Sequence, residues 1–188
     1  MNHSQTYSQY DNFMGRWSRE VATQFIKWIG PEPHLSWLDV GCGTGTLAQT
    51  VIKNCSPSLI VGTDPLKSSI EAAKLHPENK DVEFQIGDVQ DLPFDQAKFD
   101  FVISGLMIKF VKDKVRAIRE MKRVTRAGGM IALYDWDMDG NMNTTRHFWD
   151  AVSNIRPERI ESPQARKTPM TEIGSIASLF ESAGINEI

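Results

Sequence analysis

Residues 37–47 contain three glycines in the pattern Gly-Cys-Gly-Thr-Gly and pass from an apolar run into a helical one. Glycine permits a tight turn and lets the backbone approach a ligand closely, because no Cβ atom stands in the way. A helix that begins after such a turn presents free N–H groups and its positive dipole end to the ligand. An ordinary strand-to-helix turn has the same pattern, so the motif alone does not decide between structure and binding.

Two acids follow later apolar runs at places where a nucleoside could bind. Asp64 lies about twenty residues beyond the glycines, where an acid can accept hydrogen bonds from both hydroxyls of a ribose. Asp88 could accept a hydrogen bond from the exocyclic amine of a base. Leu66 and Val89 could hold that base between them. Each acid alone is as well explained by a turn or a helix cap, but their places after successive strands favour an adenosine pocket.

Alternating strands and helices would bring these residues together. Apolar runs predict strands at residues 36–40, 59–62, 82–86, 99–104 and 130–135. Helical spacing predicts helices at residues 16–29, 46–53, 66–75, 113–124, 145–155 and 171–183. Residues 127–129, Ala-Gly-Gly, are expected to break the helix before the last strand. This order predicts an α/β fold with a doubly wound, mostly parallel sheet, whose ligands bind at the carboxyl ends of the strands.

The composition is that of a soluble globular chain of one domain. The 188 residues carry a net charge of −3, so the overall charge gives no reason to expect a nucleic acid or an anionic membrane as partner. No apolar run is long enough to span a bilayer, and the polar first ten residues lack the apolar core of a secretory signal. Cys42 and Cys55 form neither a disulfide framework nor a metal-binding pattern. We therefore expect a cytoplasmic protein without a metal.

The sequence resembles the class I S-adenosylmethionine-dependent methyltransferases of the broad small-molecule, UbiE-like type. The resemblance covers roughly residues 37–135. It is carried by residues 38–45, Asp64, Gly87-Asp88, residues 99–102 and residues 126–129. It implies a Rossmann-like fold with strand order 3-2-1-4-5 and S-adenosyl-L-methionine as cofactor. The family often has proline where this chain has Ala127, at a turn that lies away from the cofactor.

The resemblance also implies which residues meet the cofactor. The methionine part would face Asp39, Gly41, Cys42 and Gly43, and the main chain near Ser104 would line the same end. Asp64 would hold the ribose, and Asp88 with Val89 would hold the adenine. Pro65 and Leu66 are also expected to contact the cofactor. Residues 10–18 resemble the family's N-terminal cover, in which Arg16 would meet the cofactor carboxylate.

The expected reaction is methyl transfer to a small-molecule acceptor by in-line displacement. Because the donor is already activated, the protein must mainly align the acceptor and exclude water. Asp135, Asp137 and His147 could act as a general base, but a strand-end cap, a loop acid and a solvated helix residue explain them better. A non-catalytic cofactor-binding module stays an alternative. A nicotinamide dehydrogenase is a weaker one, because Thr46 stands where its third glycine would be.

The layout is expected to be one domain over residues 1–188, in three parts. Residues 1–30 would be a lid and helix, residues 36–136 the cofactor-binding core, and residues 137–188 acceptor-side helices. We expect residues 1–17 to order when the cofactor binds. The resembling family has two more strands after the helix at 171–183, and here the chain stops at the start of one. The closing hairpin is therefore expected to be missing from a truncated chain, which would leave an uncovered sheet edge open to self-association.

Overall fold

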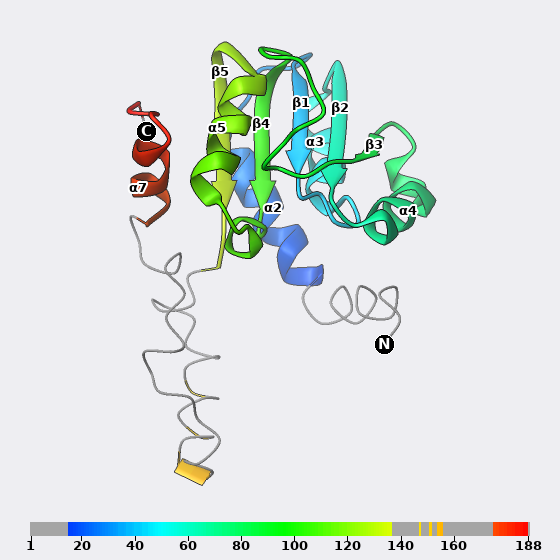
Figure 1. Ribbon diagram of the computed structural model, residues 1–188. Coiled ribbons are helices and arrows are strands. Elements are labelled where there is room, and N and C mark those ends of the chain that lie inside the picture. Colours follow the sequence, from blue (N-terminus) through cyan, green and yellow to red (C-terminus); the bar gives the residue numbers. More distant parts are fainter. Residues whose placement is uncertain (1–14, 137–146, 148–150, 152–153, 156–174, 188) are drawn as a thin grey trace. The chain divides into compact units, whose positions relative to one another are not determined.

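The computed structural model describes residues 15–136, 147, 151, 154–155 and 175–187 (Figure 1). The chain divides into two compact units, Met1–Tyr134 and Asp135–Ile188. The first unit holds the sheet and the glycine-rich turn, and the described part of the second holds helix α7 (Ser175–Ser182). The division into lid, core and acceptor-side helices within one domain stays a prediction. Most of the predicted lid and most of the predicted helix at 145–155 lie outside the described residues.

A five-stranded parallel sheet forms the centre of the first unit, with the predicted order β3-β2-β1-β4-β5. The strands pair in parallel through the neighbours β3 with β2, β2 with β1, β1 with β4 and β4 with β5. Their bounds are β1 (Ser36–Val40), β2 (Leu59–Asp64), β3 (Glu83–Ile86), β4 (Phe99–Gly105) and β5 (Thr125–Tyr134). The α/β fold class is thereby confirmed.

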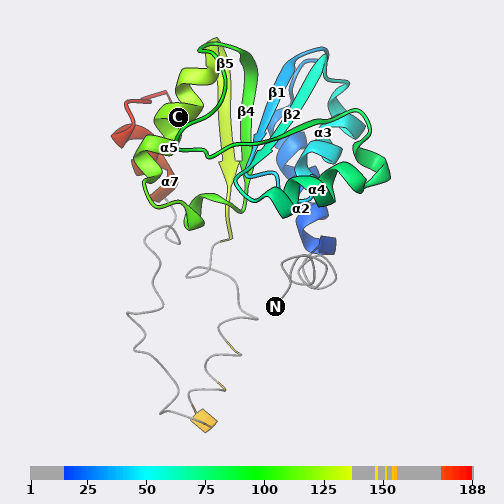
Figure 2. The same cartoon turned by 45° about the vertical axis from the view of Figure 1, so that its right-hand side comes forward.

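Helices cover both faces of this sheet (Figures 1 and 2). Helices α2 (Arg16–Ile29) and α3 (Thr46–Cys55) lie together on one face, where Ala22, Phe25 and Val51 enter the core around Trp37. Helix α5 (Lys114–Val124) covers β4 and β5 on the other face. Helix α4 (Lys67–Leu75) packs on β2 and β3. Two 3-10 turns, η2 (Pro77–Asn79) and η3 (Ile108–Phe110), complete the described elements of the first unit.

The sequence interpretation was wrong about residues 127–129. Helix α5 already ends at Val124, and β5 begins at the next residue, so Ala127-Gly128-Gly129 lies within the strand. The ladder shifts register between Phe99 and Phe101 where these glycines pass β4. A Cβ atom at Gly129 would lie 2.6 Å from the Asp100 carbonyl oxygen, so glycine is needed there for close approach of the two strands rather than as a helix stop.

Strand β5 lies at one edge of the sheet formed by the described residues. It pairs with β4 from Phe101↔Met130 to Gly105↔Tyr134, and Met130 remains 42% exposed. Self-association through this edge stays a prediction. No helix among the described residues has the length and apolar character needed to cross a membrane.

Candidate functional site

The glycine-rich turn lies between the carboxyl end of β1 and helix α3. Gly41 and Gly43 have φ angles of +70° and +54°, in the left-handed region that favours glycine. The turn is fastened to the next strand, because the Cys42 N–H donates to the Thr63 carbonyl at 2.9 Å. A Cβ atom added to Gly43 would meet no atom within 4 Å. The backbone at Gly43 therefore faces open space that a ligand can approach closely.

Asp39 lies beneath this turn and is almost completely buried. Its Oδ2 accepts a hydrogen bond from the Ala48 N–H at 3.1 Å, in the first turn of α3. Burial raises the pKa of Asp39 to about 7, and the negative charge of Asp64 adds to the increase, while the Ala48 hydrogen bond opposes it. The carboxyl group thus joins β1 to α3, and a nearby positive charge on a ligand would favour its ionised form.

Asp64 ends β2 and is held by two backbone amides. Its Oδ2 accepts from the Gly43 N–H at 3.1 Å, and its Oδ1 accepts from the Leu66 N–H at 2.9 Å. The turn-capping interpretation is therefore correct. It does not exclude ligand binding, because each carboxylate oxygen has a second lone pair for a hydroxyl donor. The hydrogen bonds fix the direction of the acid beside the open turn.

The end of β3 adjoins the same region. The Gly87 N–H donates to the Asp64 carbonyl at 3.2 Å, which places the following Asp88 next to the end of β2. Asp88 is exposed, and its Oδ1 accepts from the Gln90 N–H at 2.9 Å. Leu66 is 45% exposed, whereas Val89 is buried. Of the two apolar residues expected around a base, only Leu66 is exposed.

Ser104 near the end of β4 is not available through its side chain. Its hydroxyl donates to the Val40 carbonyl at 2.8 Å, and the residue is buried. This bond ties β4 to the strand that leads into the glycine turn. Only the main chain near Ser104 can line a ligand site, as the resemblance implies.

These contacts bring the carboxyl ends of β1, β2, β3 and β4 to one edge of the sheet. Residues 38–133, which contain all of these strand ends, match the family described as Methyltransferase domain. The chain belongs to this family. The match covers the glycine turn, Asp64, Asp88 and the carboxyl ends of β1 to β4.

Individual relatives agree with the family. The chain is 30% identical to the 2-phytyl-1,4-beta-naphthoquinone methyltransferase of Arabidopsis thaliana, over 64% of this chain and 49% of that protein. It is 30% identical to the demethylmenaquinone methyltransferase of Staphylococcus aureus, over 69% of this chain and 55% of that protein. The chain thus spans about half the length of these curated relatives. A solved S-adenosyl-L-methionine-dependent methyltransferase from Methanococcus maripaludis has the same fold, with a TM-score of 0.72 at 19% identity over 97% of this chain and 84% of that one.

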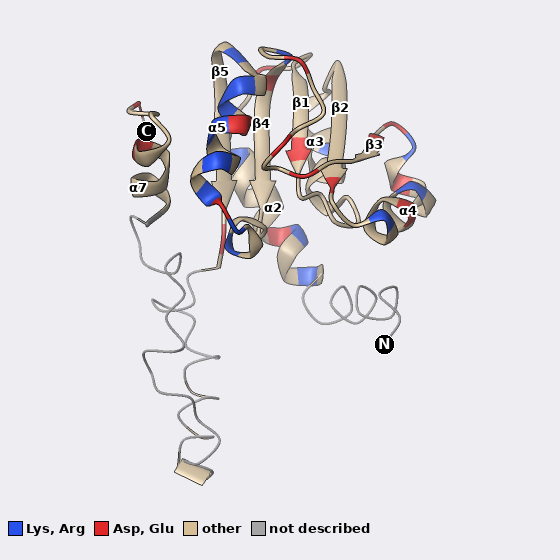
Figure 3. Ribbon diagram, in the orientation of Figure 1, with Lys and Arg blue, Asp and Glu red and all other residues tan. Residues whose placement is uncertain are grey.

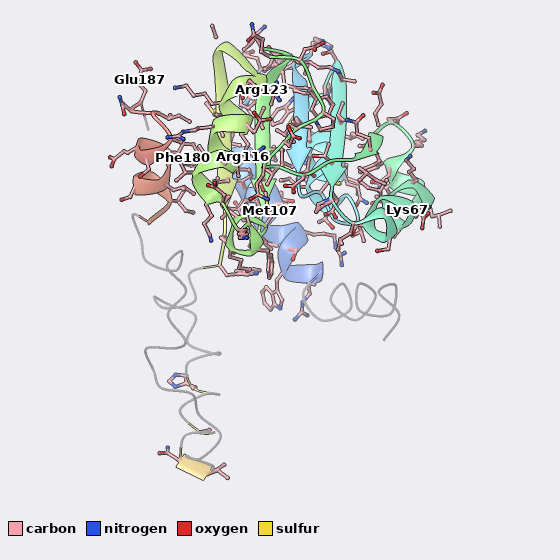
Figure 4. All side chains as sticks on the ribbon, viewed as in Figure 1. Lys67, Met107, Arg116, Arg123, Phe180 and Glu187 are labelled. Carbon is pink, nitrogen blue, oxygen red and sulfur yellow. The ribbon has the colours of Figure 1, made fainter. Side chains whose placement is uncertain are left out.

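Met107 contacts the glycine turn of this methyltransferase domain, which the sequence did not reveal. A Cβ atom at Gly41 would lie 2.2 Å from Met107 Cγ, so the methionine side chain packs directly on the glycine turn. Figure 4 shows Met107 at the lower end of the sheet, near the start of α5. The preceding residue, Leu106, has a φ of +60°. This left-handed conformation turns the chain after β4, so that Met107 lies against Gly41. An apolar residue after a predicted strand gives no signal for this contact.

Tyr134 is a second residue that the sequence did not single out. Its ring lies 4.7 Å from the Phe25 ring of α2, centroid to centroid. A Cβ atom at Gly105 would lie 2.6 Å from the Tyr134 hydroxyl oxygen. Tyr134 therefore covers the end of β4 next to the turn that carries Met107.

The remaining predicted residues lie apart from these contacts. The Arg16 guanidinium stacks on the Trp17 ring, 4.6 Å from its centroid, and its role at a cofactor carboxylate stays a prediction. Pro65 is exposed at the end of β2.

Among the candidates for a general base, Asp135 Oδ1 accepts a hydrogen bond from the Trp136 N–H at 2.8 Å, consistent with a strand-end cap. His147 is exposed, and Asp137 lies outside the described residues.

Proposed function

We propose that this chain binds S-adenosyl-L-methionine and transfers its methyl group to a small-molecule acceptor. The family membership supports methyl transfer as the reaction class. The observation that carries the cofactor assignment is the position of Asp64, whose Oδ2 accepts from the Gly43 N–H at 3.1 Å beside open space. An acid fixed next to an accessible glycine turn suits a ribose and the group attached to it.

The other strand ends supply the rest of the proposed cofactor site. Asp39 and the backbone of Gly41, Cys42 and Gly43 would adjoin the methionine part, and the buried Asp39 carboxylate would favour its positive charge. Asp64 would accept hydrogen bonds from the ribose hydroxyls. Asp88, which is exposed, would accept from the adenine amine, and Leu66 would cover one face of the ring.

The bound cofactor supplies an activated methyl group on a sulfonium. The residues around the glycine turn would hold that methyl group in line with the acceptor atom, so that the acceptor could take the methyl group as the sulfur leaves with the bonding electron pair. A proton on the acceptor leaves to solvent or to a base. The chain's own part would be to position the acceptor and exclude water, for which Met107, packed on Gly41, and Tyr134, packed on Gly105, are the proposed lining residues.

Two curated relatives are named for methylation of naphthoquinone-type compounds. We therefore propose a ring-containing acceptor of the quinone type as the first class to test. We also propose that the reaction takes place in the cytoplasm, which the two free thiols, Cys42 and Cys55, support.

The test combines binding and transfer. Calorimetric titration with S-adenosyl-L-methionine is expected to show one site, and NADH is expected to show none. Incubation with the methyl-labelled cofactor and demethylated quinones is expected to give labelled products. NADH binding without S-adenosyl-L-methionine binding would overturn the proposal in favour of a dehydrogenase. Cofactor binding without transfer to a broad panel of acceptors would favour the non-catalytic module.

A further inference from the structure

The charge of the chain is distributed very unevenly. Residues 98–126 contain nine lysines and arginines but only three acids, which gives this segment a charge of +6. The whole chain has a charge of −3, so the remaining residues together carry −9. The small overall charge therefore conceals a strongly basic region (Figure 3). The positive residues are Lys98, Lys109, Lys112, Lys114, Arg116, Arg119, Lys122, Arg123 and Arg126.

Helix α5 gives this region a defined face. Its apolar residues Ala117, Ile118, Met121 and Val124 are all buried. Between them, Arg116, Arg119 and Lys122 are exposed at intervals of three residues, which keeps them on the side of the helix away from the sheet. Figure 3 shows basic residues on successive turns of α5, down to the loop that precedes the helix.

The three acids of the segment have specific partners at its margin. Glu120 bonds to Arg123, whose guanidinium also donates to the carbonyls of Leu92 and Phe94. Asp100 pairs with Arg126. Asp113 caps the helix through the Arg116 N–H at 2.9 Å. Arg123 and Arg126 are thus paired within the fold, and over the whole of residues 98–126 the nine cations outnumber the three acids by six.

An exposed aromatic ring lies at the start of this basic face. Phe110 in η3 is 79% exposed, while its neighbours Ile108 and Val111 are buried and anchor the turn. The Lys109 ammonium lies 5.3 Å from the Phe110 ring centroid. Since Lys109 lies over one face of the ring, the ring is less suited to stack on a nucleic-acid base. An aromatic ring among lysines instead suits the headgroup region of a bilayer.

We propose that the basic surface formed by Lys109, Phe110, Lys112, Lys114, Arg116, Arg119 and Lys122 docks on a membrane leaflet that contains anionic lipids. The cations would bind headgroups electrostatically, and Phe110 would insert at the interface. Because only Leu106 and Met107 lie between β4 and η3, docking would bring the Met107 end of the site close to the bilayer. If the proposed function holds, an acceptor with an apolar tail could then enter from the membrane.

The test is sedimentation of the whole chain with lipid vesicles. Binding is expected with phosphatidylcholine vesicles that contain about 30% phosphatidylglycerol, and it should weaken as salt is raised. Vesicles of phosphatidylcholine alone should bind little. The double variant Lys112→Glu/Arg116→Glu should lower the partition coefficient at least about tenfold. Phe110→Ser should lower it by about threefold or more, because the apolar contact is lost.

Helix α4 and the turn after it offer matched controls. Lys74→Glu/Lys80→Glu changes the net charge by the same amount at two exposed positions. Leu75→Ser removes an apolar side chain that is 84% exposed, more than Phe110. Both controls should retain vesicle binding. Equal losses in the α4 controls, equal binding to neutral vesicles, or binding to an oligonucleotide but not to vesicles would overturn the proposal. Titration of the same variants with S-adenosyl-L-methionine measures cofactor binding independently of vesicle binding. A failure of the membrane proposal can therefore be distinguished from a failure of the proposed function.

Discussion

The amide N–H of Gly43 donates a hydrogen bond to Oδ2 of Asp64 across 3.1 Å. This bond joins the turn after β1 to the last residue of β2, so the acid and the glycine turn fix each other's position. The Leu66 N–H holds the other oxygen of the same carboxylate at 2.9 Å. A change at Asp64 therefore affects both the proposed ribose contacts and the local turn.

Asp64→Ala is expected to weaken S-adenosyl-L-methionine binding by roughly 1–3 kcal/mol, because two hydroxyls lose a charged acceptor. Calorimetric titration measures this loss, and thermal denaturation checks that the variant is folded. Asp81→Ala removes an exposed acid before β3 and is expected to leave the affinity unchanged. An Asp64→Ala variant that is folded and binds with the original affinity would remove Asp64 from the site.

Gly41→Ala and Gly43→Ala form a matched pair within one turn. At both positions φ is positive, so alanine should cost about 1 kcal/mol of folding free energy through the backbone alone. Only at Gly41 does the new methyl group collide with a side chain, because its Cβ atom would lie 2.2 Å from Met107 Cγ. We expect Gly41→Ala to lower the free energy of unfolding, measured by urea denaturation, by about 1–3 kcal/mol more than Gly43→Ala does.

The double variant Gly41→Ala/Met107→Ala separates the collision from the backbone cost. Shortening Met107 should recover part of the stability that Gly41→Ala loses, as a double-mutant cycle would show. Gly43→Ala, although more stable than Gly41→Ala, should weaken cofactor binding, since its methyl group would point into open space beside Asp64. Equal losses at the two glycines would contradict the Met107 contact.

The elements that the sequence predicted best are those fixed by local patterns. Helix α2 has the predicted bounds, Arg16–Ile29, because its apolar face repeats at helical spacing and Gly30 ends it in a left-handed conformation. Strand β1 also has its predicted bounds, since a short apolar run before glycines leaves few alternatives. The order of strands and helices then determined the fold class, because right-handed crossovers allow few arrangements.

The features that sequence reasoning missed depend on contacts between distant residues. The Ser104 hydroxyl is used by the Val40 carbonyl, 64 positions away, so its type alone could not show that its side chain is unavailable. The start of β5 was misplaced because Ala127-Gly128-Gly129 resembles a helix stop, whereas close approach to Asp100 requires glycine there. The contact between Met107 and Gly41 likewise depends on how the chain turns at Leu106.

Asp39 should give the stability of the chain an unusual dependence on pH. Burial raises the pKa of Asp39 to about 7 in the folded chain, whereas an unfolded aspartate has a pKa of about 3.9. Between these two values the folded chain keeps a proton that the unfolded chain has released. The folded state then binds more protons, so the contribution of Asp39 to the free energy of unfolding falls as the pH rises through this window. Below about pH 4 both states hold the proton, and Asp39 imposes no penalty of this kind.

Asp39→Asn removes this titration but keeps a side-chain oxygen that can accept from the Ala48 N–H. Relative to the original chain, the variant should therefore gain stability as the pH is raised from about 5 to 8, by roughly 1–4 kcal/mol in total. Urea denaturation of both proteins across this range measures the difference, in which titrations common to the two cancel. Asp81→Asn, at an exposed position, should follow the original chain in parallel. If the free energy of unfolding of Asp39→Asn also follows that of the original chain in parallel, Asp39 is ionised in the folded state throughout this range. Its buried carboxylate must then be stabilised by more than the Ala48 hydrogen bond.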